Sequence, residues 1–221
     1  MANKKGSSLL MVWGEMPAEK EEDFNRWYKE EHLLDLLRLP GVLSAARYEA
    51  VSGGPKHLAC YEMEGPEVFE SAEWKRYQDN PTDWTKRIAY RETATAFVNN
   101  RFTMIHPAQV TSEIAQADMA PFLQIGRMDV PTDIEDKFNE WYNTIYVPNY
   151  EKVAGCIRAR RFQAFQGEPK YLVVYEFEHE KVSQSPEWLT ARESSPVTAT
   201  IRPHMKHSPG SPGIWKKTFQ P

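Results

Sequence analysis

Apolar and polar positions alternate with two different periods along the chain, and the same series of segments occurs twice. A period near 3.6, typical of an amphipathic helix, runs through residues 19–39 and again through 133–153. Short apolar runs and segments with a period of two predict strands before and after each helix. The predicted strands are 9–13, 42–51, 57–64 and 98–105, then 122–126, 156–165, 171–178 and 214–220.

The repeat is also visible residue by residue. At an offset of 114 positions, the segment from Leu9 to Trp74 aligns without a gap with the segment from Leu123 to Trp188, and 22 of the 66 pairs are identical. Typical composition would give roughly 4 identities by chance. Each copy therefore has the predicted order βαββαβ, with a second helical region around the motifs SAEW and SPEW.

A βαββαβ unit forms a four-stranded antiparallel sheet with its helices on one face. The other face of each sheet needs a cover, and two units in one chain provide it by packing sheet against sheet. The sequence thus predicts an α+β protein of two ferredoxin-like repeats that form an intramolecular pseudo-dimeric barrel with helices outside. The expected division is residues 1–107, a linker 108–121 and residues 122–221.

The two predicted long helices differ in their chemistry. Residues 24–32 read FNRWYKEEH, whereas residues 138–146 read FNEWYNTIY. At 100° per residue, the aromatic and acid–base positions of the first helix share a sector of about 140° that would face the sheet. In the second copy, that sector has lost its titratable acid–base groups: Glu31, His32 and Asp35 are replaced by Ile145, Tyr146 and Asn149.

This one-sided loss makes the first copy the expected functional half and the second its structural partner. A histidine beside a carboxylate is suited to moving protons near neutral pH. We expect His32 as acid or base, Glu31 or Asp35 as its orienting group, and Tyr28 as a donor to a substrate oxygen. The alternatives are a structural His32 and a Glu31 that forms an ion pair with Arg47 or Lys29.

Further residues are expected to line the substrate site of the first copy. Several have identical counterparts in the second copy, which equally indicates a packing role. His204 and His207, three positions apart, lack a matching acid or cysteine, so we expect no metal site. The expected substrate-binding residues are Trp27, Asp35, Arg47, His57, Tyr61 and Trp84.

Composition narrows the classes of partner. The net charge of −4 and the pI of about 5.9 argue against nucleic acid and anionic membranes. No apolar run approaches the roughly 20 residues of a membrane span. Cys60 and Cys156 follow no metal or CxxC spacing, which favours free thiols in a reducing compartment. We expect a cytoplasmic protein.

The segments FNRWYKEEHLLDLLRLPGVLSAARYEA and GGPKHLACYEMEGPEVFESAEW together resemble the EthD-like branch of the dimeric α+β barrel superfamily. The family often has a proline two residues after the histidine. Here that position is Leu34, whereas the second copy has Pro148, so we expect a longer helix in the first copy. The resemblance implies the barrel fold and one of several activities: cyclase, cofactor-free monooxygenase, isomerase, decarboxylase or lyase, or haem binding.

Of these activities, a cofactor-independent lyase best fits the residues. The expected reaction is a C–C cleavage, such as deformylation or decarboxylation, of a small aromatic or phenolic catabolite by acid–base catalysis centred on His32. We expect His32 and Glu31 to titrate as a coupled pair. The alternatives are isomerisation, cyclisation or oxygenation, a haem protein with His32 as axial ligand, and a non-catalytic binding protein. A homodimer, in which two of these pseudo-dimeric chains associate, is a possible assembly.

Overall fold

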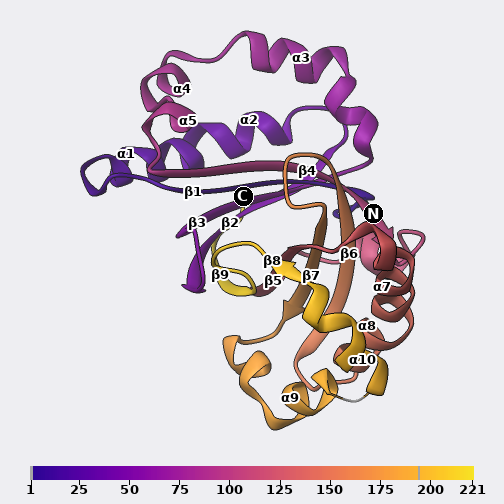
Figure 1. Cartoon of the computed structure of the whole chain (residues 1–221). Helices are drawn as coiled ribbons and strands as arrows, with labels where there is room; N and C mark the ends of the chain where they lie inside the picture. The colour runs from indigo at the N-terminus through magenta and orange to yellow at the C-terminus, as the bar shows by residue number, and fades with distance from the viewer. Residues whose placement is uncertain (1, 194) are drawn as a thin grey trace.

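Strands from both halves of the chain close one antiparallel barrel. The computed structural model describes residues 2–193 and 195–221. Eight strands form the barrel, in the order β7-β6-β4-β1-β3-β2-β9-β5, and β5 closes it against β7 (Figure 1). The strands are β1 (Ser8–Glu15), β2 (Val42–Ser52), β3 (His57–Met63), β4 (Ala96–His106), β5 (Phe122–Asp129), β6 (Cys156–Gln166), β7 (Tyr171–Phe177) and β9 (Gly213–Phe219), with a short β8 (Lys206–His207) beside β5.

We call residues 1–107 the first half and residues 122–221 the second half. They meet edge to edge, because β4 pairs with β6 and β2 pairs with β9. Within the first half the strand order is β4-β1-β3-β2, and within the second it is β9-β5-β7-β6. The predicted α+β class and antiparallel barrel are therefore confirmed.

Helices cover the outside of the barrel in two groups, one for each half (Figure 1). The segment that joins the halves carries the short helix α6 (Ser112–Gln116). The first group is α1 (Ala18–Trp27), α2 (Leu33–Leu37), α3 (Ala72–Asp79), α4 (Asp83–Ile88) and α5 (Tyr90–Thr93). The second is α7 (Glu135–Trp141), α8 (Val147–Glu151), α9 (Pro186–Arg192) and α10 (Pro196–Ile201). The 3₁₀ turns are η2 (Pro66–Glu70), η3 (Thr132–Ile134), η5 (Glu180–Gln184) and η6 (Arg202–His204).

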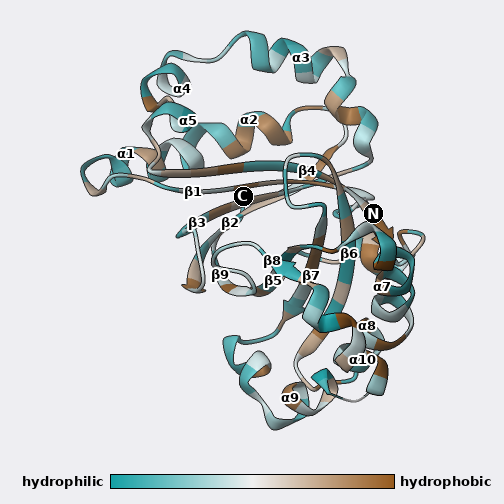
Figure 2. Cartoon of the chain, in the orientation of Figure 1, coloured by the Kyte–Doolittle hydropathy of each residue, from teal (hydrophilic) through white to brown (hydrophobic). Residues whose placement is uncertain are grey.

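Most barrel strands bury residues on both faces, whereas in β4 the buried residues, Asn100 and Phe102, share one face. In β1, Leu10 and Val12 point to the helices of the first half, whereas Leu9, Met11 and Trp13 point into the barrel. The protein thus has one core inside the barrel and one under each group of helices. Strands buried on both faces read as near-continuous apolar runs, which explains the pattern of LLMVW. Figure 2 shows brown stretches along the strands and teal over much of the outer surface of the helices.

Both predicted long helices contain a π-helical turn, which the sequence did not indicate. Residues Tyr28–His32 form the turn η1 between α1 and α2, closed by the Leu33 amide donating to the Tyr28 carbonyl five residues earlier. Residues Tyr142–Tyr146 form the equivalent turn η4, which leads into α8. Such turns are rare in proteins overall, and those that do occur often lie at functional sites.

The expectation of a longer helix in the first half is wrong. Helix α2 ends at Leu37 and α8 ends at Glu151, which are equivalent positions at the offset of 114. Pro148 is accommodated because it lies in the first turn of α8, directly after the π-turn, where the regular hydrogen-bond ladder is already interrupted. Gly41 and Gly155 follow the two helices with φ of 84°, as predicted for residues that end a helix.

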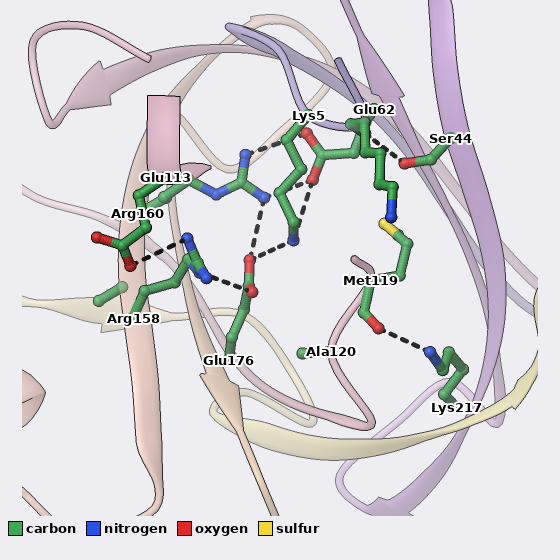
Figure 3. A network of polar contacts seen from close by, with 12 residues as sticks. Lys5, Ser44, Glu62, Glu113, Met119, Ala120, Arg158, Arg160, Glu176 and Lys217 are labelled. Carbon is green, nitrogen blue, oxygen red and sulfur yellow. Dashed lines mark hydrogen bonds and ion pairs between the residues drawn. The ribbon is translucent and has the colours of Figure 1, made fainter. Parts of the chain in front are cut away.

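A buried ionic network lies inside the barrel near one end (Figure 3). Arg160 forms an ion pair with Glu62 through two hydrogen bonds and lies 3.3 Å from Glu176. Lys5, from the N-terminal segment, places its Nζ 2.6 Å from Glu176 and 3.7 Å from Glu62. Burial alone would raise the pKa of Glu176, but Lys5 and Arg160 lower it overall. The network therefore joins the N-terminal segment to both halves.

Two simpler expectations also have outcomes. Cys60 and Cys156 are both free thiols, Cys60 buried and Cys156 half-buried. Among the described residues, no helix has the length and apolar character needed to cross a membrane.

Candidate active site

A cavity of about 550 Å³ lies between the barrel and the helices of the first half. Its floor comes from β1 and β3, and its walls come from η1, α3 and the segment around α5. Aromatic side chains dominate the lining, with a few polar groups among them, which is typical of small-molecule sites. The aromatic residues are Trp27, Tyr28, Tyr61, Trp74, Tyr77, Tyr90 and Phe97.

His32 lies on the wall of this cavity, held by two aromatic neighbours. Its ring stacks on Trp27, with centroids 4.1 Å apart, and its Nδ1 lies 2.9 Å from the Tyr77 hydroxyl oxygen. It also borders a smaller cavity of about 190 Å³, which Tyr77 and Thr82 line as well. Burial, and then the charge of Arg47, lower the pKa of His32 to about 3. The imidazole is therefore neutral at physiological pH.

Tyr28 and Arg47 form a pair beneath the cavity. The Arg47 guanidinium lies 3.8 Å from the centroid of the Tyr28 ring and donates to Asn25 at 3.3 Å. Burial raises the pKa of Tyr28 to about 12, and the Arg47 charge opposes that rise. Tyr28 is thus a neutral hydroxyl whose donor strength Arg47 increases. Its neighbour Tyr61 is fully buried and also lines the cavity.

Glu31 has a different place from the one expected. The π-turn directs it toward α4, where its carboxylate accepts from Thr82 at 2.6 Å, from Trp27 at 3.2 Å and from Thr85 at 3.3 Å. Thr82 is also the N-cap of α4. Glu31 therefore fixes α4 and the Trp27 ring, whereas the group bonded to His32 is Tyr77.

Several residues predicted to bind substrate lie outside the lining of the cavity. Asp35 pairs with Arg38 at 2.7 Å on the surface of α2. Trp84 donates to Asp23 of α1 at 3.1 Å. His57, only 1% exposed, lies 3.1 Å from Glu21 at the start of the helix layer. Arg47 lies behind Tyr28. Trp27 and Tyr61 are the members of that set that reach the cavity.

The sequence missed several lining residues that follow β3. The repeat offset makes Ala191 the equivalent of Tyr77, so the rule that singled out His32 would also have singled out Tyr77. Tyr90 follows Ala89, which has a φ of 43°, an uncommon left-handed conformation for a residue with a side chain. This turn brings Tyr90 against Tyr28 and Phe97. Lys86, Arg91 and Glu92 also line the cavity and bring charged groups to it.

The second half also contains a cavity, which the sequence did not predict. It measures about 500 Å³ and occupies the equivalent place between the barrel and the helices. Its wall contains Tyr146 at the position of His32. The Tyr150 hydroxyl donates to that of Tyr146 at 3.0 Å, and Trp141 packs on the Tyr146 ring at 4.3 Å.

One cluster of the described residues has the composition of a metal site. Glu21, Glu49 and His57 place ligand atoms within 4.8 Å of one another. Lys56 already forms an ion pair with Glu21, and the equivalent residues Glu135 and Tyr171 form a hydrogen bond of 2.7 Å. The cluster thus matches a structural contact of the second half. The expected absence of a metal at His204 and His207 stays a prediction.

Comparisons with known proteins identify the fold. No protein-family model matches the chain, and no curated protein matches it. A solved anthrone oxidase-like protein is similar with a TM-score of 0.67 and 13% identity, over 100% of this chain and 95% of that one. A chlorite dismutase from Candidatus Nitrospira defluvii in complex with imidazole is similar with a TM-score of 0.60 and 7% identity, over 97% of this chain and 91% of that one. A haem-binding protein from Thermus thermophilus is similar with a TM-score of 0.53 and 13% identity, over 97% of this chain and 92% of that one. The chain therefore has the dimeric α+β barrel fold.

Proposed function

We propose that the protein is an enzyme that moves a proton on a small aromatic substrate bound in the first-half cavity. The observation that carries this proposal is the pairing of His32 with Tyr77 on the wall of an aromatic cavity. With Nδ1 engaged by Tyr77, Nε2 is the nitrogen left for the substrate. It acts as a base when the Nδ1 hydrogen is donated to the Tyr77 oxygen.

The electrostatics of the cavity suit a substrate that becomes negatively charged. In the empty cavity, burial and Arg47 disfavour the imidazolium form of His32. A substrate anion supplies the missing opposite charge, so proton transfer produces an ion pair in which each charge stabilises the other. Tyr28, polarised by Arg47, donates a hydrogen bond to the oxygen on which the negative charge develops.

For the reaction itself, we propose a cofactor-independent lyase step. The π-system of a phenol can hold the electron pair that stays on the ring carbon when the C–C bond breaks, and that carbon takes a proton from the His32 imidazolium in place of the departing fragment, so the cleavage needs no bound cofactor. Oxygenation of the same anion is the second outcome, favoured by the anthrone oxidase-like neighbour. In either case Trp27 and Tyr61 bind the ring of the substrate, and Glu31 acts by holding Trp27 in place.

The assignment to the EthD-like branch belongs to the same proposal. The equal strand orders of the two halves support duplication of a ferredoxin-like unit, with the acid–base site kept in the first half. A homodimer of this barrel and a cytoplasmic location stay predictions.

Haem binding is a second candidate function, favoured by the geometry of His32. A haem-ligating histidine usually holds its other ring nitrogen in a hydrogen bond, as His32 does with Tyr77, and the neutral imidazole suits ligation. Lys86 and Arg91 on the cavity lining provide cations for propionate groups. Bound haem would supply one-electron and oxygen chemistry. A Soret band after addition of haem, lost in His32→Ala, distinguishes this function from the lyase.

Turnover assays on phenolic aldehydes and acids test the main proposal. We expect His32→Ala to lower kcat by about 10²–10⁴-fold, the usual contribution of a general base, with an unchanged circular dichroism spectrum. Tyr146→Ala is the matched control in the second half and should keep most activity. Equal losses in both variants, or full activity in His32→Ala, would overturn the assignment.

A further inference from the structure

We propose that the second-half cavity is a separate binding site for a small aromatic anion. Its walls are rich in tyrosine, with Tyr142, Tyr146 and Tyr150 from the helix and Tyr175 from β7, and Trp188 adds a larger ring. At about 500 Å³, it is nearly as large as the cavity of the first half. This volume and lining suit one substituted benzene ring.

An unsatisfied hydroxyl inside the cavity points to a ligand. Tyr175 is 2% exposed, and its hydroxyl makes no hydrogen bond of normal geometry in the described structure. The nearby hydroxyl of Tyr142 interacts with it without satisfying that geometry. An unsatisfied polar group of this kind costs free energy in the empty protein. A phenolic hydroxyl on the ligand provides the missing partner.

The charges of the lining select an anion. Arg192 and Arg202 both line the cavity, and no aspartate or glutamate does so among the described residues. Glu193, beside the cavity, lies 2.9 Å from Nε of Arg192 and 2.9 Å from Nη1 of Arg202. Two guanidinium groups and one carboxylate leave a net positive charge. Burial lowers the pKa of His207, so that imidazole adds no charge at neutral pH.

The same cavity has no histidine at the position of His32 in the π-turn, and its own imidazole, His207, lies on β8. Tyr146 stands where His32 stands in the first half, and burial raises the pKa of both Tyr146 and Tyr150. These hydroxyls stay neutral and serve as hydrogen-bond donors at physiological pH. The second-half site therefore binds its ligand and releases it unchanged.

Isothermal titration calorimetry with 4-hydroxybenzoate tests this site, with the neutral 4-hydroxybenzyl alcohol as the comparison probe. Arg202→Gln removes a charge at the half-exposed rim, and Tyr175→Phe removes only the unsatisfied hydroxyl. We expect each variant to weaken one binding event by about 10-fold or more, because hydrogen bonds to charged or buried groups are strong. The alcohol should bind at least 10-fold more weakly than the acid.

Tyr61→Phe is the matched control, because Tyr61 is the equivalent buried tyrosine of the first half, and its hydroxyl also lacks a normal hydrogen bond. It should leave that binding event unchanged. Thermal unfolding without ligand should show no loss of stability in Tyr175→Phe, which separates lost binding from lost folding. The proposal is overturned if 4-hydroxybenzoate does not bind at millimolar concentration, or if Tyr61→Phe alone weakens its binding.

Discussion

The two π-turns occupy equivalent positions in the two halves, but they carry different hydrogen-bonded side chains. In the first half His32 bonds to Tyr77, which comes from α3. In the second half Tyr146 bonds to Tyr150, which comes from the same helix. Beneath both, a buried arginine packs on a tyrosine: Arg47 on Tyr28 and Arg161 on Tyr142. The arginine–tyrosine pair is therefore common to both halves, and the halves differ in the residues that are bonded above it.

The comparison also shows how a substitution at one position is balanced at another. Tyr77 has Ala191 as its equivalent, and Tyr150 has Leu36. Each half thus keeps one hydroxyl within reach of the π-turn, but supplies it from a different element. In the second half Tyr150 stacks on Trp188 with centroids 4.0 Å apart, which secures the tyrosine pair by packing.

The largest expected effect is on the free energy of unfolding, and it concerns a feature that both halves share. Glu62 and Glu176 occupy equivalent positions, and both neutralise cations inside the barrel. Glu62→Gln and Glu176→Gln each leave buried cations without full compensation, so each should lower the free energy of unfolding by about 3–5 kcal/mol. Urea denaturation measures this. A loss below about 1 kcal/mol in either variant would show that the network does not support the barrel.

A smaller effect on activity tests where the halves differ. Tyr77→Phe removes the partner of His32 Nδ1, and we expect kcat to fall about 10-fold because the ring loses its fixed orientation and tautomer. Tyr150→Phe removes the matching bond of the second half and should not change kcat. Since the pKa of His32 is about 3, kcat/KM should show no imidazole limb between pH 6 and 7. A rise of kcat/KM between pH 6 and 7 that disappears in His32→Gln would contradict the lowered pKa of His32.

Acid sensitivity should also differ between the halves. Burial first, and then Arg47, lower the pKa of His57 to about 4, whereas its counterpart Tyr171 stays neutral in acid. The unfolded chain takes up a proton near pH 6.5, so His57 loses its contribution as pH falls from 6.5 toward 4. His57→Tyr should therefore reduce the acid destabilisation by about 1–3 kcal/mol. Denaturant titrations at pH 7 and pH 4.5 measure the difference, and equal acid losses would contradict it.

The smallest expected effect concerns Glu31. Glu31→Gln keeps an acceptor for Thr82 and Trp27, so kcat should change by less than about 3-fold, and the free energy of unfolding should fall by about 1 kcal/mol. Ile145→Val is the matched change at the equivalent position of the second half. A loss of activity as large as that in His32→Ala would restore Glu31 to a catalytic role.

The strand pattern and the repeat predicted the barrel because the apolar runs and the alternation of the strands occur at the same positions in both copies. They also placed His32, Trp27 and Tyr61 on one cavity. The π-turns could not be predicted, since the sector calculation assumes 100° per residue throughout. That assumption placed Glu31 toward the sheet, whereas the wider turn directs it to α4.

The segment after β3 resisted prediction for a different reason. Its short helices have no sustained period, and the alignment of the two copies was followed only to Trp74 and Trp188. Tyr77 was therefore missed, although the same offset, extended to Ala191, would have singled it out, and Tyr90 was missed with it. Lys5 was missed because a lysine near the N-terminus is expected in solvent, and only the distant Glu62 and Glu176 give it a buried place.

The position of Lys5 has a consequence for the order of events on the ribosome. Its partner Glu176 is 171 residues further along the chain, which corresponds to roughly 10–35 s of synthesis at 5–20 residues per second. Until residue 160 is made Glu62 lacks Arg160, and the edges of β4 and β2 stay unpaired until β6 and β9, respectively, have been made. Unpaired strand edges invite pairing with other chains. The first half thus leaves the ribosome as a sheet with two open edges, and only synthesis of the second half closes them.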